Sequence, residues 1–213
     1  LECGGQRIQE MRVEDYEKED LPNLLSKNSF PMKFRNPEVS IIIPFYKRAD
    51  RLPYVLESLL AQKTSINFEI LIVESSGKEA TMLAQESFPQ VKVFSYAHRL
   101  PPGAARNRGA QQARGTSLAF LDADAVPDKK WLDTLYARLV SSKNVSMVCG
   151  TVSLPSAMGT ASHLLHWIEF SSFLPGLPSG FKNALCSCNL LISQADFLSS
   201  GGFNENMEMA EDL

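Results

Sequence analysis

Two acidic residues, Asp122 and Asp124, stand one residue apart in the stretch FLDADAVP, directly after an apolar run. Carboxylate oxygens are hard ligands that suit Mg²⁺ or Mn²⁺, and these cations share their remaining positions with water and phosphate oxygens. The pair could therefore hold a cation against a diphosphate, where the cation neutralises charge that develops on a phosphate leaving group. The alternative is a solvated turn before Pro127, because Asp is common in turns.

Three other residues end apolar runs in the same way. Pro44 and Tyr46 close the run VSIIIPFY, and Glu74 follows ILIV in FEILIVESSG. Tyr46 could stack on a planar ring or simply pack against its neighbours. Glu74 could accept a hydrogen bond from the N–H of a base, cap the helix that follows it, or remain an exposed acid at the end of a strand.

Charged residues further along the chain suggest contacts with phosphate and with an attacking group. Arg106 and Arg108 lie in PPGAARNRGAQQARG, in the first turns of an expected helix, where guanidinium groups and the helix N-terminus both favour a diphosphate. A solvated helical face is the alternative. Glu211 and Asp212 include a candidate general base for an attacking hydroxyl, a role that typically contributes about 10²–10⁴-fold. An acidic solvated tail would have the same local sequence.

The apolar pattern predicts the elements that must position these residues. Continuous β-branched runs are typical of strands buried in a parallel sheet, and three-four spacing is typical of amphipathic helices. Strands are predicted at 39–46, 68–77, 91–97 and 145–154, with one that opens into a loop within 117–127. Helices are predicted at 52–62, 79–87 and 129–140, with an alanine-rich one that Gly115 ends.

This alternation predicts an α/β fold, an open and mostly parallel sheet with helices on both faces. In such sheets ligands bind beyond the carboxyl ends of the strands. The strand ends near Tyr46, Glu74 and Asp122 are therefore expected to converge on one crevice.

Length and composition limit the function classes. The chain has 213 residues, 44% of them apolar and 21% charged, with a net charge of -3, which indicates one soluble domain without an electrostatic footprint for nucleic acid. The four cysteines form no regular framework and are expected to be reduced. No apolar stretch is long enough to span a bilayer and no signal peptide is evident, so a cytoplasmic protein is expected, with peripheral association at the inner face of the membrane left open.

The order of the quoted stretches resembles that of the family 2 glycosyltransferases of the GT-A type. The matching segments are VSIIIPFYKRADRLPYVLESLLAQ, FEILIVESSG, PPGAARNRGAQQARGTSLAFLDADAVPDKKWL and CNLLISQADFLSSGGFNENMEMAEDL. The resemblance implies a Rossmann-like GT-A catalytic domain over residues 39–213, preceded by an extension over residues 1–38. Because the sequence stops within the last acidic motif, the domain is expected to be incomplete at its carboxyl end.

The resemblance also implies roles for single residues. Pro44 and Tyr46 would line the nucleotide-base pocket, and Glu74 would contact the uracil. Asp122 would meet the ribose and help to hold the metal, while Asp124 would coordinate the Mg²⁺ or Mn²⁺ that bridges the donor diphosphate.

An acid of the pair Glu211 and Asp212 would act as the catalytic base, and Asp212 is the favoured one. Three features depart from the family pattern: the family usually has Asp at Glu74, often followed by a second Asp where Ser75 stands, and commonly has Asn at Lys47. The longer arm of Glu74 is expected to alter the base contacts without abolishing them.

The implied function is a metal-dependent, inverting transfer of a sugar from a nucleotide-sugar donor, with a UDP-sugar expected. The acceptor would be a hydroxyl of a glycan, a lipid-linked or another molecule in polysaccharide or glycoconjugate synthesis. Two alternatives remain: a catalytically silent module that binds nucleotide-sugar or glycan, and a nucleotidyltransferase of the same architecture. The lack of a glycine-rich, basic loop after the first strand argues against the latter.

Two segments lie outside the strand and helix alternation. Residues 163–181 are expected to form a loop-rich lid or acceptor wall. Its aromatic residues would stack on sugar faces, touch a lipid carrier, or simply cover one face of the sheet; they are Trp167, Phe170, Phe173 and Phe181. The stretch Cys186 to Asn189 is expected to be a strand with small inward residues.

Overall fold

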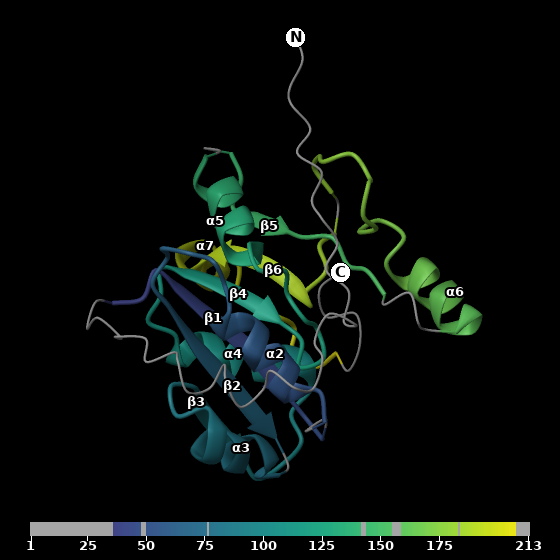
Figure 1. Ribbon diagram of the computed structural model, residues 1–213. Helices are drawn as coiled ribbons and strands as arrows, with labels where there is room; N and C mark the ends of the chain where they lie inside the picture. The colour runs from purple at the N-terminus through teal and green to yellow at the C-terminus, as the bar shows by residue number, and fades with distance from the viewer. Residues whose placement is uncertain are drawn as a thin grey trace.

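The computed structural model describes residues 36–47, 50–75, 77–141, 144–154, 159–182 and 184–207, and within them six strands and six helices alternate along the chain (Figure 1). The strands are β1 (Val39–Phe45), β2 (Phe68–Ser75), β3 (Lys92–Tyr96), β4 (Ser117–Leu121), β5 (Met147–Cys149) and β6 (Asn189–Ser193). The helices are α2 (Leu52–Leu60), α3 (Glu79–Ser87), α4 (Pro102–Gln112), α5 (Trp131–Ser141), α6 (Thr160–Glu169) and α7 (Gln194–Ser199).

One six-stranded sheet organises these elements, in the strand order β3-β2-β1-β4-β6-β5. β1 pairs in parallel with β2 and β4, and β2 pairs in parallel with β3, whereas β6 runs antiparallel to β4 and β5. The predicted α/β class and mostly parallel sheet are confirmed. The chain builds from β1 outward to β3 and then returns to place β4 on the other side of β1. The carboxyl ends of β1 and β4 therefore flank the point where the strand order reverses, which is where such sheets bind ligands.

Alternate side chains of each strand enter two separate cores, one on each face of the sheet. Ile41 and Ile43 belong to the core that includes residues of α2 and α5, and Ile42 belongs to the core that includes residues of α4 and α7. Helices thus bury both faces of β1, and this explains its continuous apolar sequence. Within the described residues, no helix is long and apolar enough to cross a membrane.

Two glycines let α4 and the turn after it approach β1 closely. A Cβ at Gly109 would lie 2.4 Å from Cγ2 of Ile42, so the helix can pack at this distance only without a side chain there. The prediction that Gly115 ends the helix is wrong, because α4 already ends at Gln112. Gly115 instead lies against β1, where a Cβ would come 2.6 Å from the backbone nitrogen of Ser40.

A buried acid, Glu69, ties together the amino-terminal edge of the sheet. Its Oε1 accepts hydrogen bonds from Oγ of Ser40 at 2.7 Å and from the backbone N–H of Arg114 at 2.9 Å. Its Oε2 accepts bonds from Nζ of Lys92 and Nη2 of Arg114, both at 2.9 Å. Burial alone would raise the pKa of Glu69, but the bonds from Ser40, Arg114 and Lys92 outweigh it and lower the pKa to about 2.

Three segments differ from the sequence prediction. β5 is much shorter than the strand predicted at 145–154, since only Met147–Cys149 pair with β6. The aromatic segment 163–181 begins within a regular helix, α6, and becomes a loop only after Glu169. The stretch Cys186 to Asn189 is not a strand throughout: Ser187 and Cys188 form a turn, and β6 begins at Asn189.

Candidate functional site

The acidic pair lies in a turn at the carboxyl end of β4. The strand ends at Leu121, and the backbone N–H of Ala125 donates to the carbonyl of Asp122 at 3.1 Å, which closes the turn. The Asp122 side chain is 36% exposed, and Asp124 is exposed. The turn that both interpretations of the sequence require is therefore present, and it leaves both carboxylates within reach of a ligand from solvent.

Arg106 reaches the acidic pair from α4. Its Nη2 donates to Oδ1 of Asp122 at 2.7 Å, and its Cζ lies 5.5 Å from the ring centre of Phe203. Because α4 packs against β1 and β2, Arg106 is only 3% exposed, and the alternative of a solvated helical face is wrong for this residue. Arg108 lies further out and pairs with Glu205 at 3.3 Å. Contact of either arginine with a diphosphate stays a prediction.

Glu74 lies fully inside the protein, with 0% of its surface exposed. Its Oε1 accepts the backbone N–H of Ala80 at 2.8 Å, and its Oε2 accepts the backbone N–H and Oγ1 of Thr81 at 3.2 and 2.6 Å and Oγ of Ser95 at 3.0 Å. Glu74 thus caps the first turn of α3, one of the three alternatives from the sequence, and the exposed strand-end acid is excluded. Contact with uracil stays a prediction, and it would require these bonds to be exchanged.

Tyr46 follows β1 at the same edge and is 38% exposed, whereas Pro44 is half-buried within the strand. Two cations lie over the Tyr46 ring: Nζ of Lys47 at 5.1 Å and Cζ of Arg99 at 5.2 Å from its centre. Lys47 has a φ of 51°, the left-handed region in which Asn is tolerated better than Lys. The Asn that the family commonly has at this position therefore has a conformational reason. Arg99 was not predicted as a site residue, because its only signal in the sequence is its place shortly after β3.

Asn107 fixes the segment that leads toward the second acidic pair. Its Nδ2 donates to the carbonyl of Phe203 at 2.9 Å, and its Oδ1 accepts the backbone N–H of Phe203 at 2.9 Å. Gly202 has a φ of 75°, and a Cβ there would lie 2.7 Å from Oδ1 of Asn107. The double glycine was the only signal in the sequence for this contact. Glu211 and Asp212 themselves lie outside the described residues.

Two cysteines adjoin the turn of the acidic pair. Asn189 pairs with Leu121 across the antiparallel strands, so the residues just beyond that pair are Cys188 and Asp122. The Sγ atoms of Cys186 and Cys188 lie 2.7 Å apart. Their hydrogen bond raises the pKa of the Cys188 thiol most, followed by burial and by nearby charges that include Asp122. The proximity of these thiols to the acidic pair was not predicted from the sequence.

The same edge of the sheet carries a pocket and several strand ends. A pocket of about 480 Å³ lies at the ends of β2 and β3; it is lined by Gly77, Lys78, Ser95, Tyr96 and Ala97. Among the described residues, no group of three or more His, Cys, Asp or Glu side chains could hold a metal ion. The site thus joins Asp122 to Arg106, and Arg106 to Phe203, while Glu74 and Tyr46 follow neighbouring strands at the same edge.

A family model described as "Glycosyl transferase family 2" matches residues 40–192. Two curated relatives cover most of the chain. The O-antigen biosynthesis protein RfbC of Myxococcus xanthus is 37% identical over 194 residues, which are 81% of this chain and 15% of the relative. The glycosyltransferase AglE of Haloferax volcanii is 30% identical over 184 residues, which are 83% of this chain and 59% of the relative.

Solved structures with low sequence identity share the fold. The mannosyltransferase PcManGT from Pyrobaculum calidifontis, in complex with GDP-Man and Mn²⁺, aligns with a TM-score of 0.62 at 19% identity, over 89% of this chain and 55% of its own. S. aureus TarS in complex with UDP-GlcNAc aligns with a TM-score of 0.60 at 20% identity, over 82% of this chain and 51% of its own. The predicted GT-A fold is thereby confirmed. The chain spans about half of each of these two solved chains, of which the TarS chain is the fragment 1–349, and 15% and 59% of RfbC and AglE.

Proposed function

Because this chain belongs to glycosyltransferase family 2, we propose that it transfers a sugar from a nucleotide donor to an acceptor hydroxyl. The observation that carries the proposal is the turn of Asp122 and Asp124 at the carboxyl edge of the sheet, beside the reversal of strand order. This is the place where open α/β sheets bind ligands. We assign the catalytic domain to residues 39–213, after an extension over 1–38.

We propose that Asp124, helped by Asp122, holds a divalent cation, Mg²⁺ or Mn²⁺. The donor set fits such an ion, because two carboxylates reach solvent from one turn and leave positions for water and phosphate oxygens. When bound, the cation would neutralise charge on the departing diphosphate. Arg106 holds one oxygen of Asp122, so the chain itself restricts how this carboxylate can turn. The Mn²⁺ in the PcManGT complex supports a divalent ion in this fold.

The remaining residues would divide the work as follows. Tyr46, with Pro44 beside it, offers a partly exposed ring on which a base can stack. Asp212 would remove the proton of the attacking acceptor hydroxyl. The hydroxyl oxygen would then displace the diphosphate directly, and this single displacement inverts the anomeric carbon. Glu74 would contact the base after exchanging the hydrogen bonds with which it caps α3.

The donor is proposed to be a UDP-sugar, with GDP as the comparison, because the structurally similar proteins bind UDP-GlcNAc in one case and GDP-Man in another. The acceptor is proposed to belong to polysaccharide or glycoconjugate synthesis. The RfbC relative is named an O-antigen biosynthesis protein, which supports this class.

Calorimetric titration of UDP and of GDP, with and without Mn²⁺, tests the site. We expect UDP to bind more tightly with Mn²⁺, and Asp124→Ala to remove this gain without unfolding the protein. Asp128→Ala is the matched control, because Asp128 is an exposed acid of the same loop. UDP binding that is independent of Mn²⁺ and unaffected by Asp124→Ala would contradict the assignment of Asp124 to the metal site.

Turnover is then assayed over a panel of UDP-sugars and hydroxyl acceptors. We expect transfer that Asp212→Asn abolishes while UDP binding persists. Binding without turnover across the panel would instead favour a silent nucleotide-sugar-binding module.

A further inference from the structure

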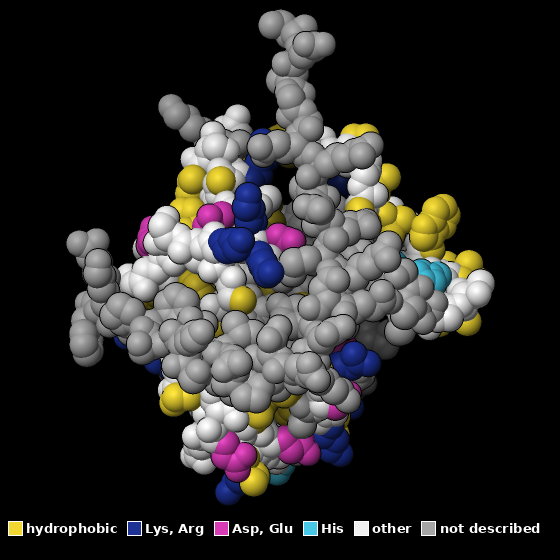
Figure 2. Space-filling view, viewed as in Figure 1, with side chains coloured by type: hydrophobic (Ala, Val, Ile, Leu, Met, Phe, Trp, Pro, Cys, Tyr) yellow, Lys and Arg dark blue, Asp and Glu magenta, His cyan; other side chains and the backbone are white. Residues whose placement is uncertain are grey.

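Helix α6 projects from the rest of the described structure (Figure 1), and none of its residues is buried. Its large apolar side chains are mostly exposed: Leu164 by 62%, Leu165 by 66%, Trp167 by 66% and Ile168 by 69%. Figure 2 shows hydrophobic side chains gathered beside histidine at the right-hand projection of this view, where α6 lies in Figure 1. Single exposed apolar residues are ordinary, but a cluster of this kind marks an interaction surface.

The polarity of α6 is inverted relative to that of an ordinary surface helix. Residues three and four apart share a helix face, which places Leu164, Leu165 and Ile168 together and His166 on the other side. The polar side meets the protein, because His166 is half-buried and its Nε2 lies 3.2 Å from the carbonyl oxygen of Val152. The apolar side therefore points away from the protein. Glu169, the last residue of α6, is the one Asp, Glu, Lys or Arg residue in this helix.

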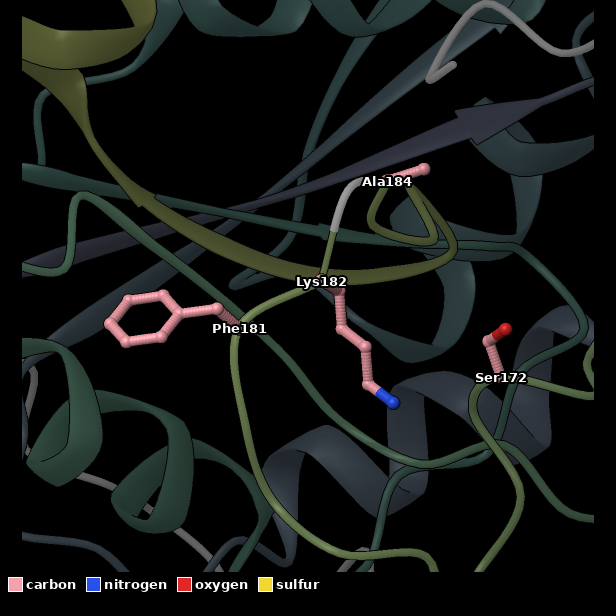
Figure 3. A pocket seen from close by; sticks show the side chains of 4 residues that line it. All are labelled: Ser172, Phe181, Lys182 and Ala184. Atoms are coloured by element: carbon pink, nitrogen blue, oxygen red, sulfur yellow. The ribbon is translucent and has the colours of Figure 1, made fainter.

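The loop after α6 carries another exposed apolar side chain next to a cation. Phe181 is 89% exposed. Lys182 lines a pocket of about 340 Å³ with Phe181, Ser172 and Ala184, and Figure 3 shows its amino group pointing toward Ser172 while the Phe181 ring points away from both. An exposed aromatic ring beside a lysine is typical of chains that meet a bilayer, where the ring enters the interface and the ammonium stays at the level of the headgroups.

We propose that α6 is a docking helix that seats this domain on the surface of a phospholipid bilayer. Leu164, Leu165, Trp167 and Ile168 together expose on the order of 500 Å², if the full surface area of a large side chain is about 150–250 Å². A stable dimer needs about 800 Å² from each partner, so a second copy on α6 alone would be held weakly. An interfacial helix needs only a narrow apolar face that enters the headgroup boundary by about 5–10 Å, and Trp favours that depth. This inference does not depend on the proposed sugar transfer.

Trp167 supplies a direct probe of the docking. The chain has two tryptophans, and the other one, Trp131, is buried with its Nε1 donating to Asn189 at 2.7 Å. We expect the fluorescence of the protein to shift to the blue on addition of phosphatidylcholine vesicles, and Trp167→Phe to remove the shift. We also expect the protein to float with these vesicles in a density gradient, with phosphatidylglycerol adding little.

Ile168→Glu tests whether the apolar face carries the attachment. The change is expected to lower the partitioning of the protein onto vesicles by about tenfold or more. It places a charge where the proposal has an apolar side chain entering the bilayer interface. Leu198→Glu is the matched control, since Leu198 of α7 is 59% exposed yet lies outside α6, and it is expected to float like the wild type. Both variants are expected to keep the circular dichroism of the wild type.

Two results would overturn the proposal. One is no flotation of the wild type with phosphatidylcholine vesicles, and the other is flotation of Ile168→Glu equal to that of the wild type. A dimer in sedimentation that Ile168→Glu converts to a monomer would assign the face to a second copy instead. UDP titration of the same proteins separates this question from the catalytic one. Flotation without UDP binding would support docking and contradict the proposed function.

Discussion

Glu69 and Asp122 are both acids held by an arginine, but they lie at opposite edges of the sheet and serve different ends. Glu69 is 6% exposed and accepts bonds from Ser40, Lys92 and Arg114, so its lowered pKa reflects a structural tie. Asp122 keeps 36% of its side chain in solvent while Arg106 binds one of its oxygens. A perturbed pKa alone would therefore select the wrong acid as a functional candidate.

The Glu69 tie predicts that stability depends on acid pH. The pKa of Glu69 is lowered from 4.5 to about 2 in the folded chain, so its contribution is fully present above pH 4.5 and disappears as the pH falls toward 2. We expect a loss on the order of 2–3 kcal/mol over that window. Urea denaturation at steps between pH 7 and pH 2.5 measures it.

Glu69→Gln is the matched variant for that experiment. It is expected to be less stable than the wild type by about 1–3 kcal/mol at pH 7, because a hydrogen-bonded buried charge is replaced by a neutral amide. The difference in unfolding free energy between the two proteins should narrow as the pH falls and Glu69 of the wild type becomes protonated. If Glu69→Gln does not fold, Lys92→Met, which removes the 2.9 Å bond from Nζ of Lys92 to Oε2 of Glu69, provides the comparison. A difference that stays constant from pH 7 to pH 2.5 would contradict the assignment.

At this scale the sequence predicted the turn of Asp122 and Asp124 and gave helix capping as one role of Glu74. It did not predict the burial of Arg106. The guanidinium binds Asp122, which is sixteen residues later in the chain and follows the end of β4. Such a pairing depends on how α4 packs against the sheet. No local pattern around Arg106 carries that information.

Among the elements, α4 contributes most to the candidate site. It places Arg106 against Asp122 and Asn107 against Phe203, and Gly109 lets it pack directly on β1. A shift of this helix would therefore move both contacts together.

Gly109→Ala tests this close packing. The new Cβ would lie 2.4 Å from Cγ2 of Ile42, a fully buried strand side chain that has little room to move. The clash should outweigh the gain of about 1 kcal/mol in helix propensity and give a net loss of about 1–2 kcal/mol. Thermal and urea denaturation measure it. Gly180→Ala is the control, because nothing lies within 4 Å of a Cβ there, and equal stability of the two variants would argue against tight packing at Gly109.

The elements most faithfully predicted are those whose apolar faces meet a core. α3 has the predicted bounds 79–87, and β1 and β2 end within two residues of the predicted ends. The segment 163–181, which includes most of α6, was expected to be loop-rich because it mixes aromatic residues with proline and glycine. β5 was predicted too long, because side-chain periodicity does not show where a neighbouring strand ends.

For the whole molecule, the sequence predicted a mostly parallel sheet but not the antiparallel direction of β6. Apolar runs show that a strand is buried, whereas its direction depends on how the long segment between β5 and β6 returns to the sheet. That return brings the Gly202 and Phe203 segment onto α4.

Asn107→Ala tests that long-range contact. It removes both bonds to the Phe203 backbone and the 3.1 Å bond from Nδ2 to Glu205. We expect faster hydrogen exchange at the Phe203 amide and a loss of about 1–2 kcal/mol in unfolding free energy. Gln111→Ala, at an exposed amide of the same helix, is the control. Unchanged exchange at Phe203 would show that other contacts hold this segment.

The bond pair between Asn107 and Phe203 joins residues that are 96 positions apart. Closing so long a loop is entropically costly, so we expect this contact to form late in folding. During synthesis the amino-terminal strands emerge first. The nascent chain can therefore pair the strands β1 to β4 before Phe203 has left the ribosome. A ribosome-bound intermediate would then hold Arg106 against Asp122 while the partner of Asn107 is still missing. The order of translation would thus leave this face of α4 uncovered until the residues after β6 arrive.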